Sequence, residues 1–377
     1  MSGPLIGILG GYGGVGQATA RLIDASGLGR LRIAGRRPEL ARQFVDDSLR
    51  GEAEAVAADV EDPLSLSRFC SGCRIVINSS GPSYQVLDRV ARAAFEAGAD
   101  YVDPGGDEAI HSRLSGQEWI AAGRTAVLSA GMIPGLSGLL PKWLARQGFA
   151  SLRSLTAHVC LKDRFTPAAA REYLLSLSSG YGESLAAWRN GRRVSRVAQP
   201  LLHKELPFFS RPVSAYPYLS SEAERVAKAL GLSDLSWYNV FEGEHVLAAV
   251  GRLQAVPPEQ RDSAAMQLAQ AAELDLFGQA PYQLFVFQME GEDASGASLT
   301  RTLLLRGRDS YELSGTVAAL TVQKMLQEAV PPGVHFAMDV LDPAATLEHL
   351  RHSPAVSSVE FIHQGAEEEI EMDEGML

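Results

Sequence analysis

The chain has 377 residues, of which 46% are hydrophobic, and it carries a formal net charge of -11 at pH 7. This length is enough for two hydrophobic cores, and the negative charge disfavours nucleic acid as a partner. No apolar run reaches the roughly 18 residues of a membrane-spanning helix, and the amino terminus lacks the pattern of a secretory signal. With three cysteines, we expect a cytoplasmic protein that has neither a disulfide framework nor a metal site.

The first element is an apolar segment, residues 6–9, which runs through a glycine-rich turn into the helical pattern of residues 17–23. The spacing Gly-x-Gly-x-x-Gly supplies a tight bend, a close backbone approach to a pyrophosphate and close packing of strand on helix. The start of the helix adds free N–H groups and a positive dipole end. We therefore predict that a dinucleotide contacts the turn, at Gly11, Tyr12, Gly13, Gly14, Val15 and Gly16.

The second apolar segment, residues 31–34, ends in Gly35-Arg36-Arg37. In a dinucleotide-binding unit this position contacts the adenosine ribose, and an acidic residue here would accept a hydrogen bond from the 2′-hydroxyl. Two arginines instead offer charged, forked donors to a 2′-phosphate. Arg36 and Arg37 therefore indicate NADP(H) rather than NAD(H). The alternative is that both side chains belong to a solvated turn.

Strands alternate with helices through the rest of the first third, with strands predicted at 55–60, 74–78, 101–103 and 125–129 and the clearest helix at 84–98. This alternation of nearly all-apolar strands with helices indicates an α/β fold, a Rossmann-type doubly wound parallel sheet covered on both faces. Ligands bind beyond the carboxyl ends of such strands. We therefore expect Asp103 at the rim of the cleft and cofactor contacts at Asp59, Val60, Ser79, Ser80 and Gly81. Ordinary turn chemistry is the alternative for the serines and the glycine.

The cysteines are interpreted as structural residues. Cys70 and Cys73 have the spacing of a redox motif, but they precede a strand and have no second pair for a zinc site. Cys160 lies alone within an apolar segment, which is typical of a core position.

Beyond about residue 135 the alternation stops. A helix is predicted at 139–147, and a long helical pattern at 316–330 is expected to return to the nucleotide domain. Between them, a period-two pattern at 154–162 and apolar segments at 247–250, 282–290 and 298–306 predict a second sheet of antiparallel strands. The chain ends in an acidic tail, residues 364–377.

Four stretches together resemble the saccharopine dehydrogenase-like reductases: residues 10–16, residues 75–82 with their Asn-Ser-Ser-Gly-Pro ending, residues 101–103, and residues 130–135. The resemblance covers the first ~140 residues well and the remainder in outline. It implies an NADP-binding domain in two segments, 1–135 and about 312–355. It also implies an inserted α+β substrate and dimerisation domain on a mixed or antiparallel sheet, residues 136–311. Members are usually homodimers, and they reduce or form a carbon–nitrogen bond with a nicotinamide.

One turn departs from the members that make branched amino acids, which carry an acidic residue where this chain reads Gly131-Met132-Ile133-Pro134-Gly135. Without that partner for an ammonium group, a free amino-acid substrate is disfavoured. Aromatic residues gather between 173 and 241, which suits a heterocyclic ligand as well as a domain core. In its size, in the missing acidic residue of that turn and in segments such as Ser179-Gly180-Tyr181-Gly182-Glu183-Ser184, the chain resembles the thiazolinyl imine reductases of pyochelin-type siderophore biosynthesis. This implies reduction of a small-molecule imine by NADPH, the imine free or tethered to a carrier protein of a nonribosomal peptide synthetase.

An imine accepts hydride best when its nitrogen is protonated or hydrogen bonded. Candidate donors are Tyr181 on a glycine-flanked loop, His158 and Lys162 on one face of the strand at 154–162, and Asp103. Water is an alternative source of the proton. Two other functions stay open: a saccharopine- or opine-type amino-acid dehydrogenase, and a non-catalytic NADPH sensor that reports to a protein partner.

Overall fold

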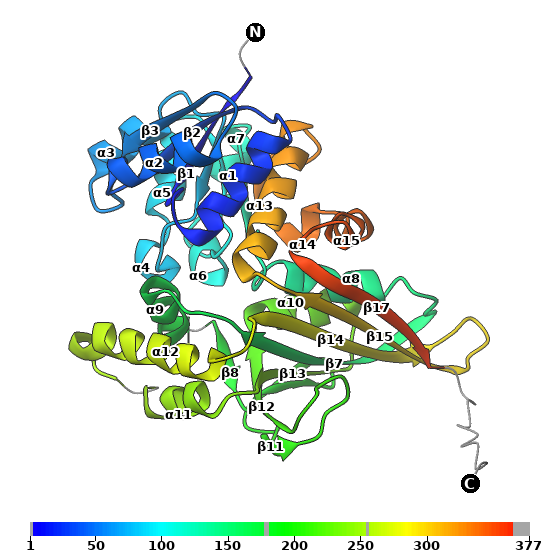
Figure 1. Cartoon of the computed structure of the whole chain (residues 1–377). Coiled ribbons are helices and arrows are strands. Elements are labelled where there is room, and N and C mark those ends of the chain that lie inside the picture. Colours follow the sequence, from blue (N-terminus) through cyan, green and yellow to red (C-terminus); the bar gives the residue numbers. More distant parts are fainter. Residues whose placement is uncertain (1–2, 177–180, 254–255, 365–377) are drawn as a thin grey trace.

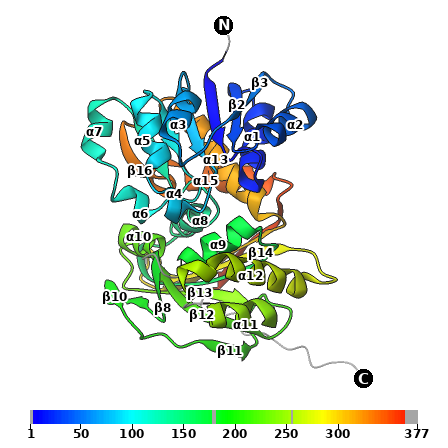
Figure 2. The same cartoon turned by 90° about the vertical axis from the view of Figure 1, so that its left-hand side faces the viewer.

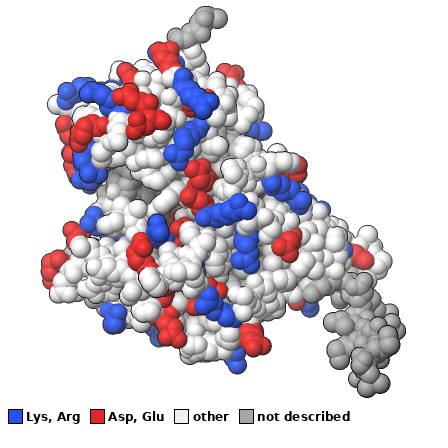
Figure 3. Space-filling model, viewed as in Figure 1, with Lys and Arg blue, Asp and Glu red and all other residues white. Residues whose placement is uncertain are grey.

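The computed structural model has two lobes, an upper one around a parallel sheet and a lower one around a mixed sheet (Figure 1). It describes residues 3–176, 181–253 and 256–364, so that the acidic tail expected at 364–377 lies outside the described residues except for its first position. Within these ranges, none of the helices has both the length and the apolar character that a membrane crossing requires. On the face shown in Figure 3, basic and acidic side chains are intermixed.

The upper lobe contains seven parallel strands in the order β16-β6-β5-β4-β1-β2-β3. The strand order reverses between β1 and β4, which is where doubly wound sheets bind their ligands. All six strands predicted from the sequence are present, with ends shifted by at most three residues, and β16 completes the sheet from the far end of the chain. The strands are β1 (Leu5–Leu9), β2 (Arg30–Gly35), β3 (Ala53–Ala57), β4 (Ile75–Asn78), β5 (Asp100–Val102), β6 (Thr125–Leu128) and β16 (Gly333–Phe336).

Helices cover this sheet. They are α1 (Gly14–Ala25), α2 (Pro38–Ser48), α3 (Pro63–Cys70), α4 (Ser83–Val86), α5 (Arg89–Glu96), α6 (Glu108–His111), α7 (Gly116–Ala121) and α13 (Ser310–Leu326). The single helix expected at 84–98 is instead divided into α4 and α5, because Leu87 adopts a φ of 52° between them. The returning helix α13 packs along α1. A Cβ atom at Gly315 would lie 2.6 Å from that of Ala18, so the glycine permits this close approach.

The lower lobe contains ten strands, seven of them in the order β10-β9-β13-β7-β14-β15-β17, with β8, β11 and β12 joined to that path through β12. The sheet is mixed because β7 runs parallel to β13 and antiparallel to β14. The last strand, β17, pairs with β15, so the chain returns to the lower lobe after supplying α13 and β16. The strands are β7 (Ser151–Lys162), β8 (Gly182–Ser184), β9 (Ala187–Arg189), β10 (Arg192–Val194), β11 (Leu201–Lys204), β12 (Val213–Ser220), β13 (Asp234–Phe241), β14 (Tyr282–Glu292), β15 (Ser298–Gly307) and β17 (Val356–Gln364).

The helices of the remaining chain are α8 (Leu136–Leu144), α9 (Pro167–Ser176), α10 (Ser221–Leu230), α11 (Glu244–Leu253), α12 (Arg261–Leu276), α14 (Ala337–Val340) and α15 (Pro343–Arg351), with a short 3-10 turn at Pro258–Gln260. Figure 2 shows α9, α11 and α12 grouped beside the lower sheet. The strand predicted at 247–250 is wrong, because these residues lie within α11. A short apolar run does not distinguish a strand from a buried helix, and Ala249 and Val250 pack in the core of this helical group.

The two faces of the lower sheet differ in what they contact. Along β7, Leu155, Ala157 and Val159 point into the main core, which they share with α8 and α10; we call this the inner face. Side chains alternate along a strand, so His158, Cys160 and Lys162 point to the opposite, outer face, where Cys160 belongs to a separate hydrophobic cluster.

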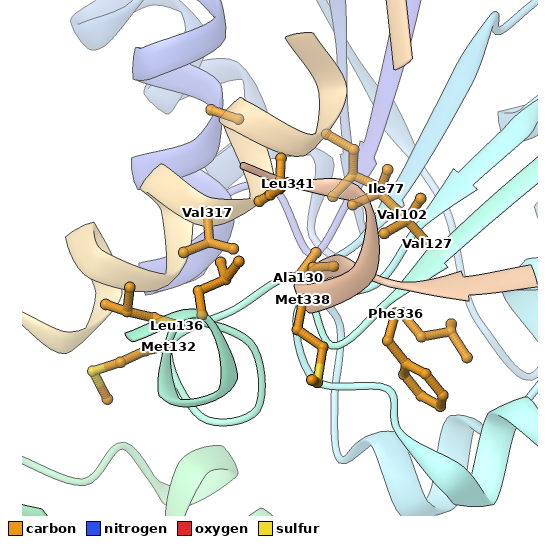
Figure 4. Packing of buried hydrophobic residues seen from close by; sticks show 14 of the residues in the cluster. Ile77, Val102, Val127, Ala130, Met132, Leu136, Val317, Phe336, Met338 and Leu341 are labelled. Carbon is orange, nitrogen blue, oxygen red and sulfur yellow. The ribbon is translucent and has the colours of Figure 1, made fainter. Parts of the chain in front are cut away.

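The main core continues into the junction of the lobes. Figure 4 shows Leu136 of α8, Val317 of α13 and Met338 of α14 gathered beside Ile77 and Val127 of the parallel sheet. The carboxyl ends of the upper strands are thereby held against the lower lobe.

Candidate active site

The glycine turn between β1 and α1 depends on the absence of side chains. Gly10 adopts a φ of 73°, and its N–H donates to the Ala34 carbonyl oxygen at 2.8 Å. A Cβ atom at Gly16 would lie 2.7 Å from the Gly11 Cα atom, which is closer than such atoms approach. The N–H of Gly13 donates to the Gly10 carbonyl oxygen at 2.9 Å. Glycine spacing therefore brings strand and helix into direct backbone contact, as the sequence predicted.

The start of α1 is suited to a phosphate. Its first residues, Gly14, Val15 and Gly16, follow Gly13, which provides no side-chain cap, and the first turn has no acidic residue. The first N–H groups of a helix have no partner within the helix and carry its positive dipole end. The Tyr311 ring packs on this turn, since a Cβ atom at Gly14 would lie 2.6 Å from its Cγ atom. These donors fit the pyrophosphate of a dinucleotide.

The arginine pair lies directly after β2, beside this turn. Arg36 and Arg37 are exposed, and neither guanidinium group forms an ion pair or hydrogen bond within the described ranges. The Tyr12 hydroxyl accepts a hydrogen bond from the Arg37 N–H at 3.1 Å. The Tyr12 ring lies on Gly35, where a Cβ atom would be 2.5 Å from Cε1. Two unpaired cations at the ribose position fit a 2′-phosphate.

The other predicted contacts follow neighbouring strands. Asp59 and Val60 come after β3, and the Asp59 carboxylate accepts a hydrogen bond from the Glu61 N–H at 3.0 Å. Ser79, Ser80 and Gly81 come after β4. The Ser79 N–H donates to the Leu9 carbonyl oxygen at 2.8 Å.

Ser80 donates from its hydroxyl to the Asn78 side-chain oxygen at 2.6 Å. The Ser79 hydroxyl is buried without a partner among the described residues. The structure thus brings the segments around β1, β2 and β4 to one edge of the sheet; contact of each residue with NADPH remains a prediction.

Asp103 organises the end of β5. Its carboxylate accepts hydrogen bonds from the Tyr101 hydroxyl at 2.6 Å and the Asn78 amide at 3.1 Å, and from the N–H groups of Gly105 and Gly106 at 3.0 and 2.7 Å. Burial raises its pKa, and these bonds oppose that effect. Asp103 lies at the expected rim, but its oxygens are used to hold the turn together. The geometry therefore favours a structural role for it over proton donation.

The lower lobe meets this edge through α9. The Glu172 carboxylate accepts a hydrogen bond from the Ser83 N–H at 2.5 Å and a second one from the Ser83 hydroxyl. Ser83 begins α4, just beyond Gly81. Burial raises the pKa of Glu172. This contact ties the lower lobe to the end of β4.

Three tyrosines lie beside that contact. The ring centroids of Tyr84 and Tyr181 are 6.4 Å apart, and those of Tyr181 and Tyr218 are 6.3 Å apart. The Tyr181 hydroxyl is buried, and no described residue hydrogen bonds to it. Burial, followed by the charges of Glu222 and Asp107, raises the pKa of Tyr181 well above its usual value, so the hydroxyl keeps its proton.

A second contact between the lobes comes from α10. Arg225 forms an ion pair with Asp107, their side chains being 17% and 3% exposed. The same guanidinium lies 3.7 Å from the centroid of the Phe336 ring. Burial raises the pKa of Asp107, although Arg225 opposes this.

Glu222, also on α10, meets the turn at residues 131–135. It accepts hydrogen bonds from the Gly135 N–H at 2.6 Å and from the Ser137 hydroxyl. Burial raises its pKa to about 7. The carboxylate that this turn lacks in the sequence is therefore supplied by a residue far along the chain.

The structure corrects the expectation that His158 and Lys162 are proton donors beside the cofactor. Both project from the outer face of β7. His158 stacks on Tyr238 with ring centroids 5.1 Å apart, and burial lowers its pKa to about 4. Lys162 forms a 2.7 Å ion pair with Glu242. The period-two pattern correctly put both on one face, but a pattern does not tell which face meets a neighbouring domain.

Sequence reasoning did not select the side chains that join the lobes, namely Ser83, Glu172, Asp107, Glu222 and Arg225. Asp107 could have been found, because it follows the turn at the end of β5. Ser83 could have been found in the same way after β4. The three on α9 and α10 have no motif spacing, and the packing of the two lobes alone brings them to the edge of the sheet.

The fold and site together define a two-domain protein whose N-terminal third carries a Rossmann dinucleotide-binding unit. Residues 6–128 match the family model described as the saccharopine dehydrogenase NADP binding domain. This third of the chain is therefore similar to that NADP-binding domain, and the match supports NADP(H) as the cofactor.

Two known proteins extend the comparison. A probable mitochondrial saccharopine dehydrogenase-like oxidoreductase of Arabidopsis thaliana is 30% identical over 96 residues, which is 24% of this chain and 21% of that protein. The match thus spans about a fifth of the curated relative. The apo structure of saccharopine dehydrogenase (L-Glu forming) from Saccharomyces cerevisiae aligns over 96% of this chain and 100% of that one, with a TM-score of 0.68 and 17% identity. This second likeness shows that the whole chain shares its two-domain fold.

Proposed function

We propose that the protein is an NADPH-dependent reductase that transfers hydride to a C=N bond. The observation that carries the proposal is the Tyr181 hydroxyl, which is buried without a hydrogen-bond partner in the described part of the chain. It lies between Tyr84, which follows the β4 end of the nucleotide site, and Tyr218 of the lower lobe. A proton-bearing group where the two domains meet is what the reduction of an imine needs.

NADPH, when bound, supplies the hydride. The chain has to hold the substrate, supply a proton and limit the access of water. Tyr181 keeps its proton because its pKa is raised, so it can donate a hydrogen bond to an imine nitrogen. Glu222 holds the turn of residues 131–135 in place through its bonds to the Gly135 N–H and the Ser137 hydroxyl. The contacts of Glu172 with Ser83 and of Arg225 with Asp107 hold the lobes together on either side.

A thiazolinyl imine, reduced to a thiazolidine in siderophore biosynthesis, is the substrate that we propose first. The three tyrosine rings supply flat apolar surface with polar tips, which suits a heterocycle. The substrate would be free or tethered to a carrier protein, and the enzyme a homodimer.

A saccharopine-type amino-acid dehydrogenase is the second candidate, and one contact favours it. Glu222 places a carboxylate at the turn of residues 131–135, where it could pair with a substrate ammonium group. The fold shared with the yeast saccharopine dehydrogenase agrees with this reading.

The test is NADPH oxidation with a synthetic thiazoline, with a panel of cyclic imines, and with an α-keto acid plus a free amino acid. We expect turnover with the thiazoline. Tyr181→Phe should lower kcat at least about tenfold while leaving NADPH affinity unchanged, and Tyr238→Phe on the outer face is the matched control. Turnover with only the keto acid and amino acid would establish the second candidate. Tight NADPH binding without turnover on any substrate would instead indicate a non-catalytic sensor.

A further inference from the structure

The outer face of the lower sheet contains a cavity that the proposed reaction does not use. Its volume is about 340 Å³, and its walls come from β14 and β15, from Glu242 just after β13, and from the loops before β12 and β14. We propose that this cavity, which we call the outer-face cavity, binds a small organic anion with a flat apolar body, such as an aryl carboxylate.

Strand register places four polar side chains close together on the outer face, and three of them, Tyr282, Glu242 and Arg306, line the outer-face cavity. Tyr282 of β14 pairs directly with Lys162 of β7. Glu242 follows β13 on one side, and Arg306 of β15 lies on the other side, diagonal to Tyr282 because it pairs with Leu284. All four occupy outer-face positions of the alternation, as His158 does. The sheet therefore fixes the spacing of these groups, and this rigidity is what a binding site requires.

The carboxylate of this group, Glu242, is already neutralised by neighbouring cations. Glu242 and Lys162 form an ion pair at 2.7 Å, with side chains 3% and 6% exposed. Arg211 adds a second cation, its Nε lying 3.3 Å from the Glu242 carboxylate. Although burial acts in the other direction, the bond to Lys162 and the charges of Lys162 and Arg211 hold the pKa of Glu242 below its usual range. Two cations thus surround one carboxylate.

Arg306 is the cation without a carboxylate. Its guanidinium carbon lies 5.2 Å from the centroid of the Tyr282 ring, and the guanidinium forms no ion pair within the described ranges. Because Lys162 and Arg211 already outweigh the charge of Glu242, Arg306 adds to an excess of positive charge at the outer-face cavity. A planar, forked donor of this kind suits a carboxylate.

The remaining wall is aromatic and strained. Phe208 and Phe209 close the cavity opposite the sheet. Phe208 adopts a φ of 72°, and this left-handed conformation is an outlier for a bulky side chain. Such strain persists where surrounding structure enforces it and is concentrated at ligand sites. Aromatic walls facing a guanidinium suit a flat anion better than an inorganic one.

The test is calorimetric titration of the full-length protein, saturated with NADPH, with benzoate. Benzamide serves as the neutral analogue and benzylamine as the cationic one. We expect saturable binding of one benzoate per chain and at least tenfold weaker binding of the other two. Arg306→Gln should weaken benzoate binding at least tenfold. Arg308→Gln, which removes the same charge two residues further on at an exposed position outside the cavity, should change it less than twofold.

Phe208→Ala provides a second variant and should also weaken benzoate. A circular dichroism spectrum and a urea-unfolding midpoint that match the wild type show that each variant is folded in both lobes. The proposal is overturned if benzoate shows no saturable binding at millimolar concentration, if benzamide binds equally well, or if Arg306→Gln binds like the wild type. It is also overturned if removal of NADPH changes the number of benzoate molecules bound, because the anion would then occupy the nucleotide cleft. None of these results depends on which substrate is reduced.

Discussion

The two sides of the candidate site, which we call its upper wall and its lower wall after the lobes that supply them, are built in opposite ways. The upper wall uses backbone N–H groups and exposed guanidinium groups from one stretch of chain, residues 10–37. The lower wall uses buried side chains from separate elements, above all Glu172 of α9 with Glu222 and Arg225 of α10. Backbone donors are in place wherever the local turn forms, whereas buried charges need partners that only packing supplies. Nucleotide binding is thus a local property, and substrate chemistry depends on the assembled lobes.

The largest effect should come from breaking the ion pair of the lower wall. Arg225→Met leaves Asp107 buried without its cation, so the free energy of unfolding should fall by about 3–5 kcal/mol. Urea unfolding measures it. Arg153→Met removes an exposed ion pair with Glu290 and should cost less than about 1 kcal/mol. Under conditions where the variant is folded, its NADPH affinity should match the wild type. A similar loss of stability in both variants would contradict the claim that burial makes the Arg225–Asp107 pair costly to break.

NADPH binding at the upper wall should weaken when a side chain enters the glycine turn. Gly16→Ala forces a Cβ atom to within 2.7 Å of the Gly11 Cα atom, and we expect NADPH affinity to fall about 100-fold, or about 2.7 kcal/mol. Fluorescence titration with NADPH gives the affinity. Gly116→Ala is the matched control, because no atom lies within 4 Å of its added Cβ position. Unchanged affinity in Gly16→Ala would show that the turn does not approach the cofactor.

The buried Glu222 should make stability depend on pH. Its pKa of about 7 in the folded state exceeds the ordinary 4.5, so the folded protein binds this proton more tightly than the unfolded chain. The contribution is full below pH 4.5 and is lost as the pH rises toward 7, on the order of 2–3 kcal/mol.

Unfolding of the wild type and of Glu222→Gln should be compared at about pH 5 and about pH 7.5. Because Glu172 and Asp107 shift in the same direction, the difference between the two proteins isolates Glu222. Glu61→Gln, at an exposed carboxylate, is the control. An identical pH dependence in wild type and Glu222→Gln would rule out the assigned shift.

The smallest effect concerns cofactor choice. Replacing Arg36 and Arg37 by serine should weaken NADPH binding by roughly 1–3 kcal/mol, the range for charge-assisted hydrogen bonds, and leave NADH nearly unchanged. Parallel titrations with both nucleotides measure the difference. Equal losses would mean that the two arginines do not contact the 2′-phosphate.

The sequence-based predictions were accurate for features set by local sequence and less accurate for features set by packing. Six of the seven upper strands and the glycine turn could be predicted, because alternation and glycine spacing are local signals, whereas β16 comes from the far end of the chain. The helix expected at 84–98 is split by the backbone of Leu87, and the segment at 247–250 is helical, because short apolar runs take their structure from what they pack against. His158 and Lys162 were placed on the correct strand and on the same face of it, but that face points away from the cleft.

The order of residues by itself determined a dinucleotide turn, a basic ribose position and a parallel sheet, since each follows from contacts between near neighbours in the chain. Only the tertiary structure decided that Glu222 meets the turn of residues 131–135, that Glu172 meets Ser83, and that Lys162 pairs with Glu242 on the outer face. Those contacts connect residues 80 to 90 positions apart, and no periodic pattern encodes a meeting between two domains.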